Sequence, residues 1–254
     1  MQNDKIYYIT TPIYYVNDVP HIGHAYTTIA ADVVARYQRL LGKEVFFLTG
    51  TDEHGLKIEK TATAKGLSAK ELVDDVVKRY IHLWKVLNIS NDDFIRTSEE
   101  RHHRAVHAFF KRVKEYGDEN IYLGHYEDWY CVPCETFWTE AQLVDGNCPE
   151  CKRPAERVKE ESYFFKMSAF QQRLLDYLAE HDQFVRPQSK LNEILGFLRE
   201  DLHDLSISRS SFNWGIPVPG DERHVIYVWF DALINYLTAA GFPDDMERFE
   251  KLWP

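Results

Sequence analysis

The hydrophobic pattern of the first third of the chain predicts alternating strands and helices. A short apolar run over 6–9 predicts a buried strand, and Pro12 and Pro20 interrupt the segment that follows. A helical pattern then runs from His21 to about Leu41, and an apolar run over 45–48 predicts a strand buried on both faces. Strand, helix and strand in this order form a right-handed crossover unit of a parallel sheet.

The middle of the chain breaks this alternation. Strand-like aromatic segments cover 121–130 and 162–166, with helical patterns beside them, and a buried strand over 224–228 resumes the earlier pattern. We therefore predict an α/β fold with a doubly wound parallel sheet of the Rossmann-like, nucleotide-binding type. We expect this fold to be incomplete and to be split by an inserted lobe.

The four cysteines give the inserted lobe its chemistry. They lie in one window, as Cys131-x2-Cys134, thirteen further residues, and Cys148-x2-Cys151. Two such pairs fit tetrahedral thiolate coordination of one zinc ion, and four ligands leave no open position, so the metal would be structural. Two disulfides are the alternative, and a cytosolic chain disfavours them.

These observations set the predicted domain boundaries. The first half of the nucleotide-binding catalytic domain is expected at 1–115. The inserted connective lobe is expected at 116–224, with its zinc knuckle at about 126–157. The start of the second half of the catalytic domain is expected at 225–254. Such a metal can stabilise a small lobe that has little core of its own.

The composition limits the expected compartment and partners of the protein, but it does not determine the function. The chain has 254 residues, 44% of them hydrophobic, and a formal net charge of −10. No apolar run reaches the roughly 20 residues of a membrane span, and no apolar leader precedes the first strand, so we expect a cytoplasmic protein with no membrane partner. The acidic balance argues against a broad nucleic-acid surface, so we expect no DNA partner and only local contact with any RNA.

Two histidines three residues apart open the first long helix. Gly23 lies between His21 and His24 and removes a side chain where a bulky group could approach the backbone. A strand, a loop and a helix N-terminus with free N–H groups form an anion cradle, to which the imidazoles could add hydrogen bonds. The alternative is an ordinary pair of histidines at a helix start.

A carboxylate follows the second predicted strand. Asp52 lies where ligands bind in parallel sheets, beyond the carboxyl end of a strand, and could hold an ammonium group. Alternatively, Asp52 or Glu53 caps the helix expected over 57–65.

Near the end of the chain, Trp229 begins a stripe of residues at helical spacing, whose other members are Ala232, Leu233 and Tyr236. Packing in the core is the ordinary role of such a stripe.

Several of these segments resemble one enzyme family. Residues 21–24, His-Ile-Gly-His, resemble the HIGH signature of class I aminoacyl-tRNA synthetases. The preceding Thr-Thr-Pro-Ile-Tyr-Tyr-Val-Asn over 10–17 and the Thr-Asp-Glu-His-Gly over 51–55 resemble the methionyl-tRNA synthetases in particular. That family also carries a zinc-bearing connective peptide where this chain has its cysteines.

The resemblance implies roles for individual residues. It places ATP at the first motif, with His21 and His24 stabilising phosphate and with Thr10 and Gly23 nearby, and it places the methionine amino group on Asp52. Methionine's side chain would lie against the 229–236 stripe, with Ile13 and Tyr15 opposite, and thioether–aromatic contacts are favourable. Arg209 in Ile-Ser-Arg over 207–209 would lie near the substrate, although a core-rim arginine is an equal alternative.

The implied reaction is adenylation followed by transfer to tRNA. The methionine carboxylate would attack the α-phosphate of ATP, with magnesium bridging the phosphates, and positioning and charge stabilisation would carry most of the catalysis.

The second class I signature, KMSKS, is absent from this sequence. Lys-Met-Ser-Ala over 166–169 lacks its final lysine and is interpreted as a strand-to-helix turn with Ser168 as N-cap. We therefore expect about the first half of the family's chain, weakly active or inactive alone.

Three other hypotheses remain open on the sequence. The chain could belong to a class I synthetase for another aliphatic amino acid. It could be a smaller HIGH-type nucleotidyltransferase, which should lack the insertion and the zinc knuckles. It could also be a non-catalytic, zinc-containing module that binds methionine or tRNA.

Overall fold

A small parallel sheet forms the centre of the N-terminal part of the molecule. The computed structural model describes residues 5–134, 136–138 and 140–253. Strand β3 (Glu44–Asp52) is the middle strand, and three strands pair with it in parallel, which confirms the predicted crossover unit. These are β1 (Ile6–Thr10), β2 (Tyr14–Tyr15) and β4 (Asp93–Arg96). β1 and β2 lie along the same side of β3, and β4 lies along the other.

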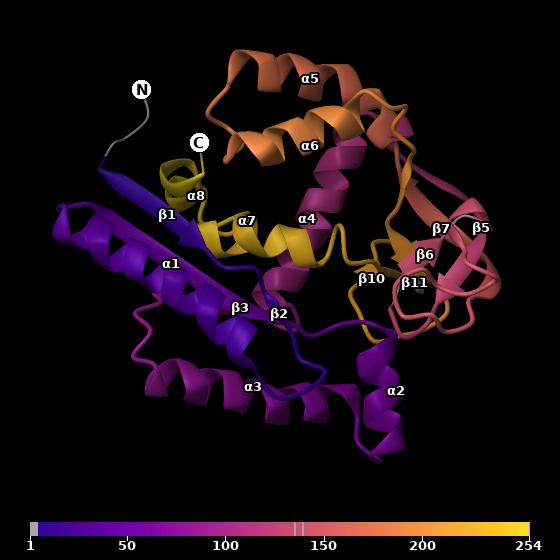
Figure 1. The fold of residues 1–254 in the computed structure, drawn as a ribbon, viewed down its shortest axis with the longest axis horizontal. Coiled ribbons are helices and arrows are strands. Elements are labelled where there is room, and N and C mark those ends of the chain that lie inside the picture. The colour runs from indigo at the N-terminus through magenta and orange to yellow at the C-terminus, as the bar shows by residue number, and fades with distance from the viewer. Residues whose placement is uncertain (1–4, 135, 139, 254) are drawn as a thin grey trace.

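Helices cover both faces of this sheet (Figure 1). One face carries α1 (Ile22–Leu40) and α3 (Ala69–Val86), with α2 (Leu56–Ala64) packed against α3. The other face carries α4 (Glu100–Tyr116), α7 (Asn235–Ala240) and α8 (Met246–Leu252). Apolar faces of α2 and α3 bury Ile58, Val73 and Tyr80 against β2, as amphipathic helices do.

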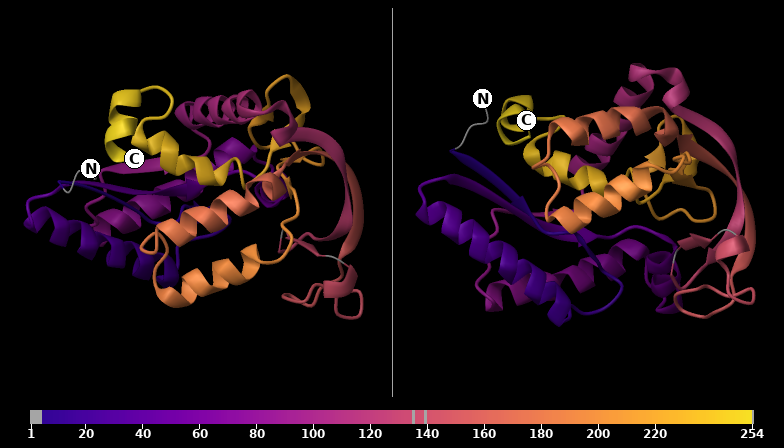
Figure 2. Two further views of the ribbon diagram at one scale, coloured as in Figure 1. Left: turned by 90° about the horizontal axis from the view of Figure 1, so that it is seen from above. Right: turned by 45° about the horizontal axis from the view of Figure 1, so that its top comes forward.

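The inserted lobe is an antiparallel sheet followed by a helical pair (Figure 2). Its long strands β5 (Ile121–Cys131) and β7 (Glu156–Phe165) pair over ten positions. The helices α5 (Gln171–Glu180) and α6 (Gln188–Leu198) bury their own leucine cluster. The remaining elements are short: η1 (Asp118–Asn120), β6 (Thr136–Trp138), η2 (Glu140–Gln142), η3 (Met167–Phe170) and β8 (Leu205–Ser206).

The strand expected over 224–228 belongs to a third sheet. Strand β11 (Asp221–Ile226) is antiparallel to β9 (Ser208–Arg209) and β10 (Pro217–Val218), so it does not extend the parallel sheet. A tight turn at Gly220, whose φ is +84°, joins β10 to β11. An apolar run shows that a strand is buried, but it does not show which partner the strand pairs with.

The helix expected from Trp229 begins later than its spacing predicts. A 3₁₀ helix η4 (Ala232–Ile234) comes first, and α7 starts at Asn235. Asp231 has a non-helical backbone, with φ −84° and ψ −80°, and its side chain bonds two buried histidines. A tertiary contact therefore overrides the helical spacing here.

The proposed cap at Ser168 is also wrong. Ser168 lies inside η3, whose N-cap is Lys166, and α5 begins after Phe170 without a side-chain cap. The Ser168 hydroxyl instead donates a hydrogen bond to Asp204 Oδ1 at 2.6 Å. The segment is nevertheless a turn after strand β7, as predicted.

One core joins the lobe to the parallel-sheet part of the molecule. Ile121 of β5 and Phe165 of β7 pack with Phe110 of α4 and with Phe230. This shared packing fixes the base of the lobe against the parallel-sheet region. In the part of the chain that the structure describes, no helix is both long and apolar enough to cross a membrane.

Candidate functional site

A cavity of about 210 Å³ opens beyond the carboxyl end of β3. Tyr15 and Asp52, which pair across β2 and β3, form part of its wall, as the sequence predicted for an amino-acid site. The wall also draws on segments distant in sequence, with the further lining residues His54, Gly55, Leu56, Tyr130, Phe212, Ile226, Tyr227, Val228 and Asp231. A carboxylate in a mostly apolar cavity suits a small ammonium ligand.

Glu53, beside Asp52, has a structural role. Its carboxylate is fully buried and accepts hydrogen bonds from Arg96 Nε at 2.7 Å and Thr51 Oγ1 at 2.7 Å. The N-cap of α2 is Gly55, so neither Asp52 nor Glu53 occupies the cap position of this helix. The ion pair to β4 instead fixes the end of β3, from which Asp52 reaches the cavity.

A buried His–Asp–His cluster includes two residues of the cavity wall, His54 and Asp231, and His102 behind them. His54 Nδ1 is 2.7 Å from Asp231 Oδ2, and His102 Nε2 is 3.1 Å from Asp231 Oδ1. The exposed fractions of the three residues are 7%, 2% and 0% for His54, Asp231 and His102. One carboxylate therefore joins β3, α4 and the turn before α7.

The charges of this cluster are strongly coupled. Burial acts to lower the pKa of His54, but the Asp231 carboxylate outweighs it and raises that pKa above its usual 6.5. Burial acts to raise the pKa of Asp231, but His54 and His102 hold it far below its ordinary value. Burial and the neighbouring His54 lower the pKa of His103 to about 4, so His103 is neutral at pH 7.

The N-terminus of α1 holds both histidines of the first motif. His21 is the N-cap, and its Nδ1 accepts the Gly23 N–H at 3.1 Å, while His24 Nδ1 accepts the His21 N–H at 3.2 Å. The two rings stack with centroids 3.7 Å apart. Because each Nδ1 accepts, each neutral ring carries its proton on Nε2. The helix start thus offers two imidazole donors at the positive end of the helix, which suits phosphate.

Burial favours the neutral form of His24, and packing holds its ring in place. Burial and then the neighbouring His21 lower the pKa of His24 from 6.5. A Cβ at Gly23 would lie 3.0 Å from Cε1 and 3.1 Å from Nδ1 of His21. The glycine therefore makes room for the His21 ring itself, a neighbour that the sequence did not reveal. Tyr14 packs on His24 with centroids 4.7 Å apart and links this motif to the adjacent Tyr15.

The other residues assigned to methionine lie in two environments. Ile13 and Tyr236 pack in one apolar cluster with Ala239, and Ala232 is buried. Trp229 and Leu233 are 45% and 51% exposed. The cavity wall includes Tyr15 and Asp52 but none of these five predicted residues.

Thr10 and Arg209 lie outside the cavity wall. Thr10 ends β1 and pairs with Leu48 of β3. Arg209 is buried, and its guanidinium lies 3.7 Å from the ring centroid of Tyr227, which lines the cavity. Its Nη1 donates to Ser206 Oγ and to the Ser208 carbonyl, both at 2.6 Å. Arg209 thus supports a wall residue from behind.

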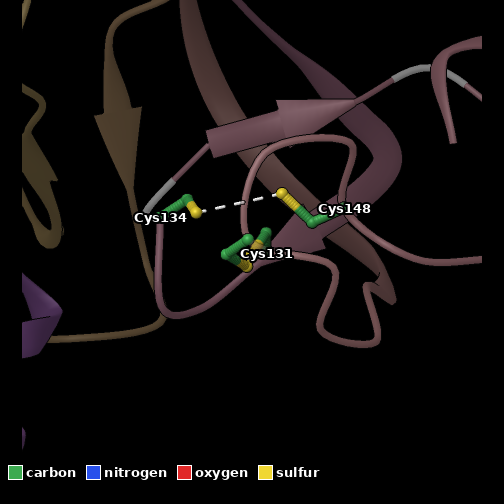
Figure 3. Close-up of side chains that lie close together, drawn as sticks. Cys131, Cys134 and Cys148 are labelled. Carbon is green, nitrogen blue, oxygen red and sulfur yellow. Dashed lines mark hydrogen bonds between the residues drawn. The ribbon is translucent and has the colours of Figure 1, made fainter. Parts of the chain in front are cut away.

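The four cysteines converge in the lobe, and Figure 3 shows three of them, Cys131, Cys134 and Cys148. The sulfur atoms of Cys131 and Cys151 are 3.4 Å apart, those of Cys134 and Cys148 are 3.8 Å apart, and all four lie within 4.8 Å of one another. All four are free thiols, which excludes the disulfide alternative. A tetrahedral site with zinc–sulfur bonds of about 2.3 Å separates its sulfurs by roughly 3.8 Å, so the donor set fits zinc.

The sequence analysis did not identify several other residues of this site. His54 was visible within the 51–55 motif, but nothing in its spacing pointed to Asp231, 177 residues away. Tyr130 and Tyr227 were likewise read as parts of apolar strands. The order of chemistry-bearing residues along a chain gives no distance between segments that only the fold brings together.

Comparison with known proteins assigns this geometry to one family. A family model described as "tRNA synthetases class I (M)" matches residues 7–159 and 152–254. The methionine–tRNA ligase of Clostridium perfringens is 57% identical over 252 residues, covering 98% of this chain and 39% of that protein. That of Thermotoga maritima is 52% identical over 252 residues, covering 98% and 40%. The chain thus spans about two fifths of the length of these relatives.

Solved structures agree with the sequence matches. Methionyl-tRNA synthetase of Mycobacterium tuberculosis in complex with methionyl-adenylate superimposes with a TM-score of 0.92 at 45% identity, covering 98% of this chain and 50% of that one. The free state of the same protein gives a TM-score of 0.79 at 42% identity, covering 98% and 48%. The arrangement found here is therefore nearer to the adenylate-bound form.

Proposed function

Because the chain belongs to the methionyl-tRNA synthetases of class I, we propose that the whole protein joins L-methionine to its tRNA through methionyl-adenylate. The observation that carries the proposal is the cavity beyond β3, where Asp52 and Tyr15 form the wall. Asp52 would hold the methionine ammonium group by a charge-assisted hydrogen bond. Tyr15 would contact the side chain from the cavity wall, whereas Ile13 and Tyr236 lie outside that wall in their own apolar cluster.

The helix start would handle the phosphates of ATP. The methionine carboxylate oxygen attacks the α-phosphorus, and the bond from that phosphorus to the bridging oxygen breaks as pyrophosphate leaves. His21 and His24 would donate Nε2–H hydrogen bonds to phosphate oxygens as charge develops there. Magnesium enters with ATP. A hydroxyl of the 3′-terminal ribose of the tRNA then attacks the carbonyl carbon of the adenylate, and the bond from that carbon to the phosphate oxygen breaks as AMP leaves.

The cysteine cluster would hold one structural zinc ion. Its ligands are Cys131, Cys134, Cys148 and Cys151, and with four thiolates the metal has no open position for chemistry. Thiolate ligands need a reducing compartment, so we place the protein in the cytoplasm. We keep 1–115, 116–224 and 225–254 as the proposed boundaries of the two catalytic segments and the connective lobe.

Methionine-dependent ATP–pyrophosphate exchange by the whole protein tests this function. The exchange should require L-methionine and proceed far more slowly with L-leucine or L-isoleucine. His24→Ala should slow it about 100-fold, the usual cost of one transition-state donor, and His24→Gln should recover part of the rate because its amide can donate. Exchange supported equally by the three amino acids would contradict the methionine assignment. An unaffected His24→Ala variant would contradict the role of the helix start.

A further inference from the structure

A chain of buried hydrogen bonds runs from α7 to the cavity. Thr238 Oγ1 lies 3.0 Å from His102 Nδ1, His102 Nε2 lies 3.1 Å from Asp231 Oδ1, and Asp231 Oδ2 lies 2.7 Å from His54 Nδ1. All four residues are buried, and only Asp231 and His54 reach the cavity wall. His102 has no place in the proposed chemistry, yet it is fully buried and polar.

The acceptors around His102 define how it bonds. The Thr238 hydroxyl donates to the Ile234 carbonyl at 3.0 Å, so its oxygen accepts from His102 Nδ1. On the other side, Nε2 faces Asp231 Oδ1 and the Asp231 carbonyl at 3.2 Å, and both oxygens only accept. Each nitrogen of His102 thus faces an oxygen of a neighbouring buried residue, so the ring bridges Thr238 of α7 and Asp231.

We propose that His102 is a positioning residue for the methionine site, acting through Asp231 on His54. His102 shares the Asp231 carboxylate, holds it in one orientation, and so sets the ring direction and the charge of His54 at the cavity wall beside Asp52. This inference rests on the proposed function, because it assumes that the cavity binds methionine.

The sharing of one carboxylate makes His102 matter for His54. Without His102, the buried Asp231 keeps His54 as its one imidazole partner, and its whole charge acts on that ring. His54 then holds its proton to a higher pH. The titratable groups that act on His54 are Asp231, Asp52, Glu53 and His103.

The test compares variants of the whole protein in the exchange assay. His102→Phe keeps a ring but removes both donors, and it should raise KM for methionine about tenfold with kcat changed less than about threefold, as expected for the loss of a charge-assisted hydrogen bond. The limb of the profile of KM against pH that reports His54 should move to higher pH. His102→Gln, whose amide still donates to Asp231, should restore most of the wild-type KM. The exposed His82→Gln serves as the matched control.

A milder variant and a stability check keep the result interpretable. Thr238→Val removes the acceptor of His102 Nδ1 without changing side-chain volume, and it should give a smaller rise in KM of the same kind. Thermal unfolding identifies any variant that fails to fold. Folded variants with an unchanged KM and pH profile would overturn the inference, as would equal losses in the Phe and Gln variants. Failure of the wild-type protein to use methionine would instead overturn the proposed function.

Discussion

The absence of a side chain at Gly23 allows the His21 and His24 rings to stack at the start of α1. Gly23→Ala would bring a Cβ to 3.0 Å from His21 Cε1, so the His21 ring must move away from its stack on His24. We expect the exchange rate constant to fall at least about tenfold, since two donors lose their orientation. Methionine affinity should stay unchanged, because Gly23 is not in the cavity wall.

Gly196→Ala is the matched control for this substitution. Gly196 lies in α6, and a Cβ there would meet nothing within 4 Å. Alanine at such a helical site stabilises by about 0.5–1 kcal/mol and should leave exchange unchanged. Equal activity of the two variants would show that the His21–His24 stack does not serve catalysis.

His103 predicts a specific sensitivity to acid. Burial and His54 lower its pKa in the folded protein to about 4, below its ordinary 6.5, so between these values the unfolded chain binds a proton that the folded chain does not. Stability is therefore lost as pH falls from 6.5 toward 4. Between pH 7 and pH 5, the free energy of unfolding of His103→Gln should fall by about 1 kcal/mol less than that of the wild type. This value is discounted for the partial exposure of the His103 ring.

Urea unfolding at the two pH values measures this difference. His82→Gln, at an exposed position of α3, should show the wild-type loss. If His103→Gln and wild type lost the same stability on acidification, His103 would not be the neutral buried histidine described here.

At the level of single residues, the sequence placed Asp52 at what proves to be the cavity wall, but it did not reveal the residues that support this wall. Asp52 could be assigned to a ligand site because it follows a buried strand, and parallel sheets bind ligands beyond the carboxyl ends of their strands. His54 lies two residues further on, but its partner Asp231 lies between the members of the stripe that helical spacing picks out. A periodic pattern carries no information about a buried carboxylate that interrupts it.

Strand β5 connects the cysteine cluster to the cavity. Its last two residues are Tyr130, in the cavity wall, and Cys131, in the cluster. Removing zinc with a chelator should loosen this strand end and weaken methionine binding by about 1 kcal/mol, or roughly fivefold, in line with the loss of one packing contact. Parallel measurements of zinc content and methionine affinity check the coupling.

Cys148→Ser provides the control for the chelator itself. This variant should bind zinc poorly and show the weakened methionine affinity from the start, so the chelator should change it no further. Full methionine affinity in a zinc-free sample would separate the lobe from the site and contradict this connection.

At the scale of the elements, local sequence patterns predicted individual strands and helices, but they did not predict which strands pair with each other. The prolines, the apolar runs and the cysteine spacing act over few residues, and the strands β1 and β3, helix α1 and the cysteine cluster were predicted from them. By contrast, β11 pairs with β9, a strand of two residues that carries no pattern of its own. Its partner could not be inferred from the apolar run alone.

At the scale of the whole molecule, the cavity depends on segments from most of the chain. Asp52 comes from β3, Tyr130 from the lobe, and Tyr227 and Asp231 from beyond β11. The shared core of Ile121 and Phe230 holds these segments in register. We therefore expect the affinity for methionine to depend on the assembled fold, including the parallel sheet, the lobe and the turn before α7.

The most direct test is a calorimetric titration of the whole protein with L-methionine, with L-leucine and L-isoleucine as comparisons and Asp52→Asn as the variant. We expect saturable binding that prefers methionine, since the cavity combines Asp52 with aromatic and aliphatic walls. Asp52→Asn should weaken binding about tenfold to 100-fold through loss of the charge-assisted hydrogen bond. Equal affinity for the three amino acids, or unchanged methionine affinity in Asp52→Asn, would contradict the assignment of this cavity as the methionine site.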